Sequence, residues 1–256
     1  MTTVSNPYDA EIAAARERLI VALDVPDVAA ARAVVSELCG TVGAFKVGMQ
    51  LFTSAGPDFV REIIDSGEKV FLDLKFHDIP NTVAAAVVEA ARLGVWMLNV
   101  HALGGREMMR RAATEVAEVC EREGIDRPLV IAVTVLTSAD DHDISEIGID
   151  SDVEDLVVRL ARLASESGLD GVVASSLEIN AIRSAVDCDS FRIVTPGIRS
   201  VNATPNDQKR VLSPAEAVRG GSDYLVVGRP ILNSPNRRAA VEAITEDIQR
   251  AIEGHL

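Results

Sequence analysis

The strongest constraint on the fold of this chain is the repeated alternation of short apolar runs with amphipathic segments. Eight runs rich in β-branched and aliphatic residues begin near Leu19, Ala44, Lys69, Val95, Pro128, Leu169, Phe191 and Asp223. Near-continuous apolar runs of this length predict strands that are covered on both faces, as in a parallel sheet. Helical periodicity is found between them, at Asp27–Cys39, Pro57–Ser66, Thr82–Leu93, Glu107–Glu123 and Asp152–Ser167.

Eight strand–helix units within 256 residues match the count and size of a closed (β/α)8 barrel, the TIM barrel. The alternative is an open doubly wound sheet, which usually has a glycine-rich turn after its first strand. Here the first run ends in ALDVPD, without such a turn, and no Ser/Pro-rich linker divides the chain. We therefore predict one barrel domain over residues 1–256, with a short extra helix near Glu11–Arg18. Between the sixth and seventh runs, Ser176–Asp187 leaves room for only a short helix.

Charge and composition exclude several classes of partner. The chain has 39 acidic and 25 basic residues and a net charge of −14, which repels nucleic acid and anionic membranes. No apolar run approaches the roughly 20 residues of a membrane span, and the N-terminal segment does not resemble a secretory signal. Three widely spaced cysteines and four histidines predict no structural zinc site. We expect a cytoplasmic protein.

The third apolar run carries charged residues at its end. Asp73 and Lys75 are two positions apart, so a strand directs both side chains to one face and the adjacent leucines to the other. The leucines suit the helix layer, which turns the charged pair toward the barrel axis. Asp24 ends the first run, and Lys46 lies inside the second. The chain has only four lysines, so two of them inside apolar runs are notable. We expect these four side chains to meet at the mouth of the barrel, where barrel enzymes place their chemistry.

An array of alternating charge in a low-dielectric mouth favours catalysis over a purely structural role, since buried ion pairs are weak stabilisers. A lysine between carboxylates stays protonated and is a good proton donor. A carboxylate aimed into the pocket opposes a substrate anion, and loss of CO2 relieves that repulsion. The array therefore suits decarboxylation followed by protonation of the carbanion. Alternatively, Asp73 and Asp78 could bind Mg²⁺, although the two lysines already supply positive charge.

The seventh and eighth runs end in TPGIR and VVGRP, at the strand ends where barrels commonly bind phosphate. Arg199 and Arg229 can add forked hydrogen bonds to phosphate oxygens. Two further residues have two interpretations each. Thr82 could contact substrate or cap the helix that follows, and Thr137 could contact a polar ring or start a loop.

Taken together, DLKFHDIPNT, KVGMQLF, LNVHALGG, VTVLTS, TPGIR and VVGRPIL resemble the bacterial type of the orotidine 5′-phosphate decarboxylase family. The resemblance extends from Leu19 to about Ser234. The Asp-x-Lys-x-x-Asp core alone is shared with sugar-phosphate decarboxylases and aldolases. The TPGIR and VGRP contexts, with Gln208 between them, are more specific.

The resemblance implies conversion of orotidine 5′-phosphate to UMP, the last step of de novo pyrimidine nucleotide synthesis, by a homodimer with no cofactor and no metal. The implied catalytic residues are Lys75, Asp73, Asp78 and Lys46. Lys75 protonates C6 of the pyrimidine, and Asp73 lies against the departing carboxylate. The implied substrate contacts are Asp24 and Lys46 to the ribose, Thr137 to the pyrimidine, and Gln208, Gly228 and Arg229 to the phosphate, with Arg199 nearby. Asp78 and Thr82 are implied to reach the partner subunit's site.

Two other functions remain open from the sequence. One is a Mg²⁺-dependent decarboxylase or aldolase of keto-sugar phosphates that uses Asp73, Lys75 and Asp78. The other is a barrel that only binds a phosphorylated metabolite. Adding a chelator distinguishes the orotidine 5′-phosphate decarboxylase from the sugar-phosphate enzyme, because only the sugar-phosphate enzyme is expected to lose activity.

Overall fold

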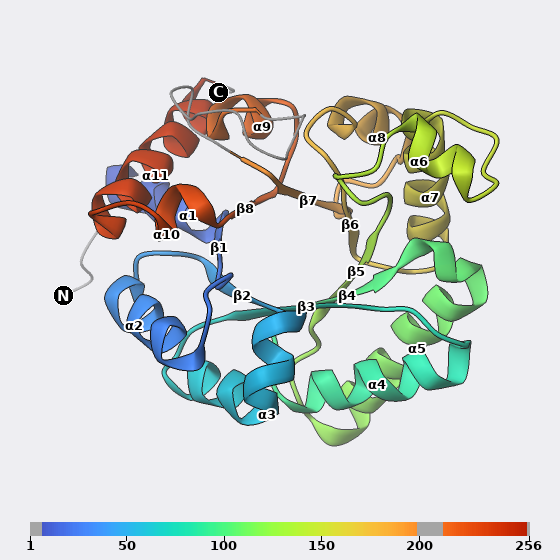
Figure 1. The fold of residues 1–256 in the computed structure, drawn as a ribbon, viewed down its shortest axis with the longest axis horizontal. Helices are drawn as coiled ribbons and strands as arrows, with labels where there is room; N and C mark the ends of the chain where they lie inside the picture. The colour runs from blue at the N-terminus through green and yellow to red at the C-terminus, as the bar shows by residue number, and fades with distance from the viewer. Residues whose placement is uncertain (1–6, 199–211, 255–256) are drawn as a thin grey trace.

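The computed structural model describes residues 7–198 and 212–254. Within them, eight parallel strands form a closed barrel in sequence order, and the helices surround it (Figure 1). The predicted (β/α)8 barrel is confirmed, and so is the extra helix before the first strand. Two predicted site residues, Arg199 and Gln208, lie outside the described residues.

The strands are short. They are β1 (Leu19–Ala22), β2 (Ala44–Gly48), β3 (Val70–Phe76), β4 (Met97–His101), β5 (Leu129–Val133), β6 (Gly171–Val173), β7 (Arg192–Pro196) and β8 (Tyr224–Val227). The helices are α1 (Pro7–Glu17), α2 (Val28–Leu38), α3 (Met49–Asp65), α4 (Pro80–Arg92), α5 (Gly105–Glu123), α6 (Asp141–Glu146), α7 (Val153–Glu166), α8 (Ile179–Ala185), α9 (Pro214–Arg219), α10 (Arg229–Leu232) and α11 (Arg237–Glu253), with a 3₁₀ turn η1 (Ala102–Gly104).

Capping residues explain where several of the helices begin. Asp27 and Asp152 each accept a backbone N–H of the helix they precede, α2 and α7, which satisfies one of its unpaired donors. Helix α3 is longer than the predicted Pro57–Ser66, because the structure joins a second helical segment to it across a kink. Gly56 has a φ of 69° at that kink, a conformation that glycine adopts without strain.

Alternating strand residues divide the core into two apolar layers. Small and large side chains such as Ala22, Phe71 and Val226 fill the interior of the barrel. The alternate residues, Leu72 among them, pack between the strands and the helices, and Leu74 packs against the same outer layer. The flanking leucines of β3 therefore face the helices as predicted, which turns Asp73 inward.

The two ends of the barrel differ in chemistry. We call the carboxyl ends of the strands the mouth and the amino ends the base. At the base, Asp223 accepts a hydrogen bond of 2.7 Å from the backbone N–H of Ile193 on the neighbouring strand β7. Asp170 does the same for Val130 of β5, also at 2.7 Å. Both aspartates also pair with arginines.

In the described part of the chain, the helices are too short or too polar for any of them to span a membrane.

Candidate active site

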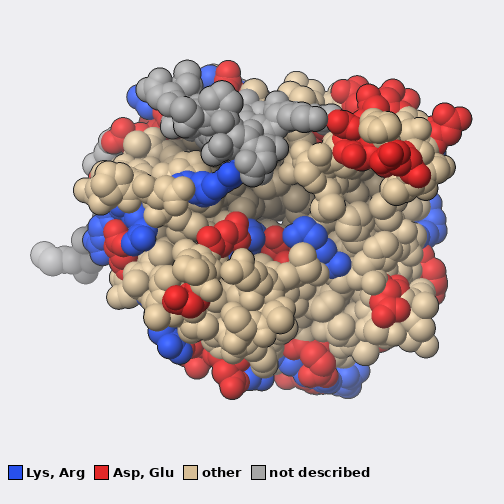
Figure 2. Space-filling view, viewed as in Figure 1, with Lys and Arg blue, Asp and Glu red and all other residues tan. Residues whose placement is uncertain are grey.

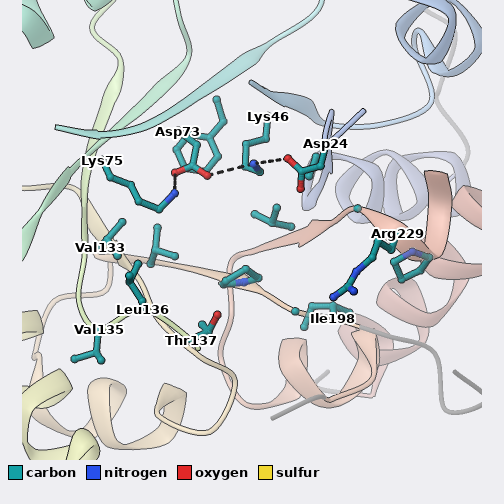
Figure 3. Close-up of a pocket in the computed structure, with 18 residues that line it drawn as sticks. Asp24, Lys46, Asp73, Lys75, Val133, Val135, Leu136, Thr137, Ile198 and Arg229 are labelled. Carbon is teal, nitrogen blue, oxygen red and sulfur yellow. Dashed lines mark hydrogen bonds and ion pairs between the residues drawn. The ribbon is translucent and has the colours of Figure 1, made fainter. Parts of the chain in front are cut away.

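A cavity of about 280 Å³ opens at the mouth of the barrel. Its polar lining side chains come from opposite sides of the barrel (Figure 3) and are Asp24, Lys46, Asp73, Lys75, Thr137 and Arg229. Apolar residues such as Phe71, Val133 and Ile198 form much of the remaining wall. In the space-filling view, acidic and basic side chains meet at the central hollow of this face, within a largely uncharged surface (Figure 2).

Four charged side chains form a continuous chain across one wall of the cavity (Figure 3). Lys46 Nζ lies 3.2 Å from Asp24 Oδ1 and 3.2 Å from Asp73 Oδ2. Lys75 Nζ donates a hydrogen bond of 2.6 Å to Asp73 Oδ1. The structure thus brings together the four residues that the sequence predicted to meet, and their charges alternate in sign.

Burial changes along this chain of charges. The side chain of Asp24 is 61% exposed, whereas those of Lys46 and Asp73 are 11% and 13% exposed. Burial by itself raises the pKa of Asp73. This effect is outweighed by the nearby ammonium groups of Lys46 and Lys75 and by the hydrogen bonds from Lys75 and Asn99, all of which lower the pKa. The net pKa lies below the ordinary value for an aspartate, so Asp73 is ionised at neutral pH.

The backbone of β3 departs from the regular strand that the sequence predicted. Lys75 has a φ of 52° and is the one residue other than glycine with a positive φ in the described ranges. Between Leu72 and Phe76 the register of β3 against β4 shifts. Lys75 reaches the pocket side of β3 together with Asp73, as two-residue alternation predicts, but it does so through a local bulge and not through a regular strand.

Asn99 on β4 is a polar residue of this region that the sequence reasoning did not select. It is fully buried, donates to Asp73 Oδ1 at 2.7 Å, and accepts from the backbone N–H of Lys75 at 2.8 Å. An amide inside an otherwise apolar strand was the available signal, because a buried polar group requires partners.

The opposite wall of the cavity contains the predicted phosphate residues. Gly228 directly follows β8 and is the N-cap of the short helix α10, and Arg229 is the first residue of that helix. Both line the cavity, and Arg229 lies across it from Lys75 (Figure 3). Thr137, on the loop after β5, also lines the cavity and is half-buried.

Two predicted site residues do not line this cavity. Asp78 is exposed, and its Oδ1 accepts the backbone N–H of Ile79 at 2.6 Å. Thr82 is also exposed, and it does not cap α4, because that helix begins at Pro80 with Ile79 at the N-cap. The paired carboxylates of the Mg²⁺ alternative, Asp73 and Asp78, therefore do not share the cavity. Over residues 7–198 and 212–254, no three His, Cys, Asp or Glu side chains are grouped to hold a metal ion.

Two histidines lie beside the lysine end of the array. The rings of His77 and His101 stack at a centroid distance of 5.3 Å. Burial, together with the neighbouring His77 ring and the ammonium of Lys75, lowers the pKa of His101 below its ordinary value. His101 is therefore neutral at neutral pH and adds no charge to the array.

Comparison with known proteins agrees with this architecture. A family model described as "Orotidine 5′-phosphate decarboxylase / HUMPS family" matches residues 17–244. The chain is 54% identical over 239 residues to the orotidine 5′-phosphate decarboxylase of Syntrophotalea carbinolica, covering 93% of this chain and 98% of that protein. It is 52% identical over 236 residues to that of Moorella thermoacetica, covering 92% and 93%.

A solved structure gives the same result for the fold. The crystal structure of orotidine 5′-phosphate decarboxylase from Lactobacillus acidophilus superposes with a TM-score of 0.79 at 38% identity, covering 90% of this chain and 98% of that one. The family model and the relatives each span most of the chain, and the residues matched by the family model include every strand of the barrel. This chain belongs to the orotidine 5′-phosphate decarboxylase / HUMPS family.

Proposed function

We propose that this protein decarboxylates orotidine 5′-phosphate to UMP, as the last step of pyrimidine nucleotide synthesis, without a metal or cofactor. The observation that carries the proposal is the Asp24–Lys46–Asp73–Lys75 array beside a cavity that also presents Gly228 and Arg229. The names of the relatives support the same substrate.

In the proposed mechanism, Asp73 opposes the carboxylate of the substrate. Asp73 is held ionised by two ammonium groups, so it faces the substrate carboxylate with like charge. As the C6–carboxylate bond breaks, the electron pair stays on C6 and neutral CO2 leaves. The repulsion is therefore present in the bound substrate and reduced in the transition state, which is the condition for acceleration of the chemical step.

Lys75 completes the reaction as the proton donor. Its ammonium, 2.6 Å from Asp73, becomes the counter-ion of the C6 carbanion as CO2 departs. The Nζ–H bond breaks, C6 gains the proton to give UMP, and the neutral amine recovers a proton from solvent. Fixed charges in a partly buried site stabilise developing charge without the reorganisation that water requires. The array replaces the electron sink that a cofactor supplies in other decarboxylases.

The other cavity residues would bind the remote parts of the substrate. Asp24 and Lys46 suit the ribose hydroxyls, Thr137 the pyrimidine, and Gly228 and Arg229 the phosphate. Arg199 and Gln208, outside the described residues, are assigned to the phosphate by the family resemblance alone. Phosphate binding so far from C6 can contribute to catalysis by organising the site.

A direct assay tests this proposal. Purified protein and orotidine 5′-phosphate are followed by ultraviolet absorbance, with and without a chelator. We expect turnover that the chelator does not change. Turnover that stops with the chelator and returns with Mg²⁺ supports the metal-dependent alternative. If the protein binds the nucleotide but does not turn it over, it is a binding protein.

We further propose a cytoplasmic homodimer in which Asp78 and Thr82 complete the partner subunit's site. Both are exposed and neither lines the cavity of its own chain. Exposed apolar side chains follow the same strand ends, namely Met49 after β2, Ile79 after β3 and Leu103 after β4. Exposed apolar side chains around a charged site are typical of a protein–protein interface, and these lie at the mouth of the barrel.

Mixing two inactive variants tests the shared site. Asp78→Asn and Lys75→Ala are each expected to be inactive. In their heterodimer, one site carries both defects and the other carries none, so a random mixture recovers about a quarter of wild-type activity. Lack of recovery in a heterodimer verified by mass spectrometry would place Asp78 in its own subunit's site.

A further inference from the structure

Asn99 is a neutral residue placed directly behind the charge array. It lies in the middle of β4 with no exposed surface, and it is not among the side chains that line the cavity. It therefore reaches the reaction only through its two partners, Asp73 and Lys75. These are the carboxylate and the ammonium to which the proposed mechanism assigns the two chemical steps.

The two hydrogen bonds of Asn99 fix the orientation of its amide. The backbone N–H of Lys75 can only donate, so the amide oxygen faces it, at 2.8 Å. The amide nitrogen then faces Asp73 and donates to Oδ1 at 2.7 Å. Asp73 Oδ1 also accepts from Lys75 Nζ, so one carboxylate oxygen joins both residues.

The same amide occupies the place of a strand partner in the bulge. Leu72 pairs with Leu98 and Phe76 with Val100, so three residues of β3 lie opposite Asn99 alone. The N–H of Lys75 is thereby bonded to a side chain of β4. This contact supports a left-handed backbone at Lys75, with φ 52°, which is disfavoured for residues with a side chain.

We propose that Asn99 is a positioning residue that sets the distance and direction between the Lys75 ammonium and the Asp73 carboxylate. The proposal rests on the decarboxylase function proposed above. It assigns Asn99 two roles: its oxygen holds the backbone of the proton donor, and its nitrogen holds the carboxylate in the ionised form. The alternative is that Asn99 only satisfies buried polar groups in the barrel.

Asn99→Ala separates these alternatives when it is paired with Ser222→Ala. Ser222 is 1% exposed and hydrogen-bonded at the base, so its loss also removes buried hydrogen bonds but leaves the mouth intact. We expect Asn99→Ala to lower kcat by about ten- to a hundredfold, the usual effect of losing a hydrogen bond to a charged group. KM changes little, because Asn99 does not line the cavity. Ser222→Ala keeps the wild-type kcat.

The pH profile gives a second readout that a structural role does not move. The charged groups facing Asp73 are Lys46 from β2 and Lys75 from its own strand, and β4 contributes the neutral amide. Removal of the amide donor raises the pKa of Asp73, so the acid limb of kcat moves to higher pH in Asn99→Ala. It stays in place in Ser222→Ala. Wild-type kcat and an unmoved acid limb in a folded Asn99→Ala protein overturn the proposal.

Asn99→Asp carries the test even if the alanine variant does not fold, because it fills the same space. The new carboxyl group keeps an acceptor for the Lys75 N–H but has a donor for Asp73 only while protonated. Burial and the adjacent carboxylate raise its pKa. We therefore expect kcat to fall with rising pH over a range where the wild-type value is constant. A profile that superimposes on the wild-type curve contradicts the proposal.

A crystal structure of either folded Asn99 variant distinguishes failure of this proposal from failure of the proposed function. We expect the backbone of Lys75 to leave the left-handed region, or its Nζ to move away from Asp73. Persistence of both the left-handed φ and the Lys75–Asp73 contact overturns the positioning role. An inactive wild-type protein overturns the decarboxylase function but leaves this structural test valid.

Discussion

The base and the mouth of the barrel both contain partly buried carboxylates, but the cations that pair with them differ. At the base, Asp223 pairs with Arg183 at 2.6 Å and Arg192 at 3.1 Å and also binds a backbone N–H. At the mouth, Asp73 pairs with the ammonium groups of Lys46 and Lys75.

The difference separates fixed charge from transferable charge. A guanidinium binds through a rigid fork and does not give up a proton at any ordinary pH. The ammonium of a lysine is compact and can transfer a proton when a stronger base forms beside it. The base therefore joins neighbouring strands, whereas the mouth keeps a labile proton beside a cavity.

The largest expected effect is on turnover, when a lysine variant at the mouth is compared with a lysine variant at the base. Lys75→Ala removes the proposed proton donor, so turnover falls by at least about 10²–10⁴-fold, the usual contribution of acid catalysis. UMP still binds, which calorimetry measures. Lys75→Arg fails as well, because guanidinium is larger and a weaker acid.

The matched control is Lys69→Ala. Lys69 ion-pairs with Glu17 and lies over the ring of Trp96, away from the cavity. This variant should keep wild-type turnover. If Lys69→Ala loses as much activity as Lys75→Ala, the functional division between the two ends is wrong.

The reverse behaviour is expected for the base. Asp223→Ala leaves two arginines and the Ile193 N–H without their carboxylate, so unfolding free energy falls by roughly 2–3 kcal/mol, less than for a fully buried pair. The expected readouts are a lower urea midpoint with kcat at the wild-type value for the folded fraction. An unchanged midpoint would show that the base network does not stabilise the barrel.

The sequence predicted the parts of this division that depend on periodicity and on charge in apolar runs. Eight apolar runs predicted eight strands, and Lys46 and Lys75 were recognisable because a charge inside a buried strand is costly. The base aspartates were not recognised, because Asp170 and Asp223 lie where ordinary turn residues also occur. Their bonds to strands distant in sequence exist only in the closed barrel.

The bulge at Lys75 shows a different limit. Leu72 and Leu74 face the helices whether or not β3 is bulged, so the apolar pattern carries no signal of the left-handed residue. The same pattern did not reveal that Asn99 is the partner of both Asp73 and Lys75. Similarly, the Asp-x-Lys-x-x-Asp spacing alone does not show that Asp78 points out of its own chain's cavity, and only the family resemblance implied that it reaches the partner subunit's site.

The smallest expected effect concerns the cavity wall opposite the lysines. Arg229 lines the cavity at the end of β8, and the net charge of −14 means that local donors must bind a phosphate dianion. Arg229→Ala should lower kcat/KM for the phosphorylated substrate by about ten- to a hundredfold, as expected for loss of a charge-assisted hydrogen bond. The unphosphorylated nucleoside offers no phosphate to this arginine, so its turnover should hardly change. Steady-state assays on both substrates make the comparison. Equal losses on both substrates would show that Arg229 does not bind the phosphate. Its role would then be to stabilise the strand end, as the arginines do at the base.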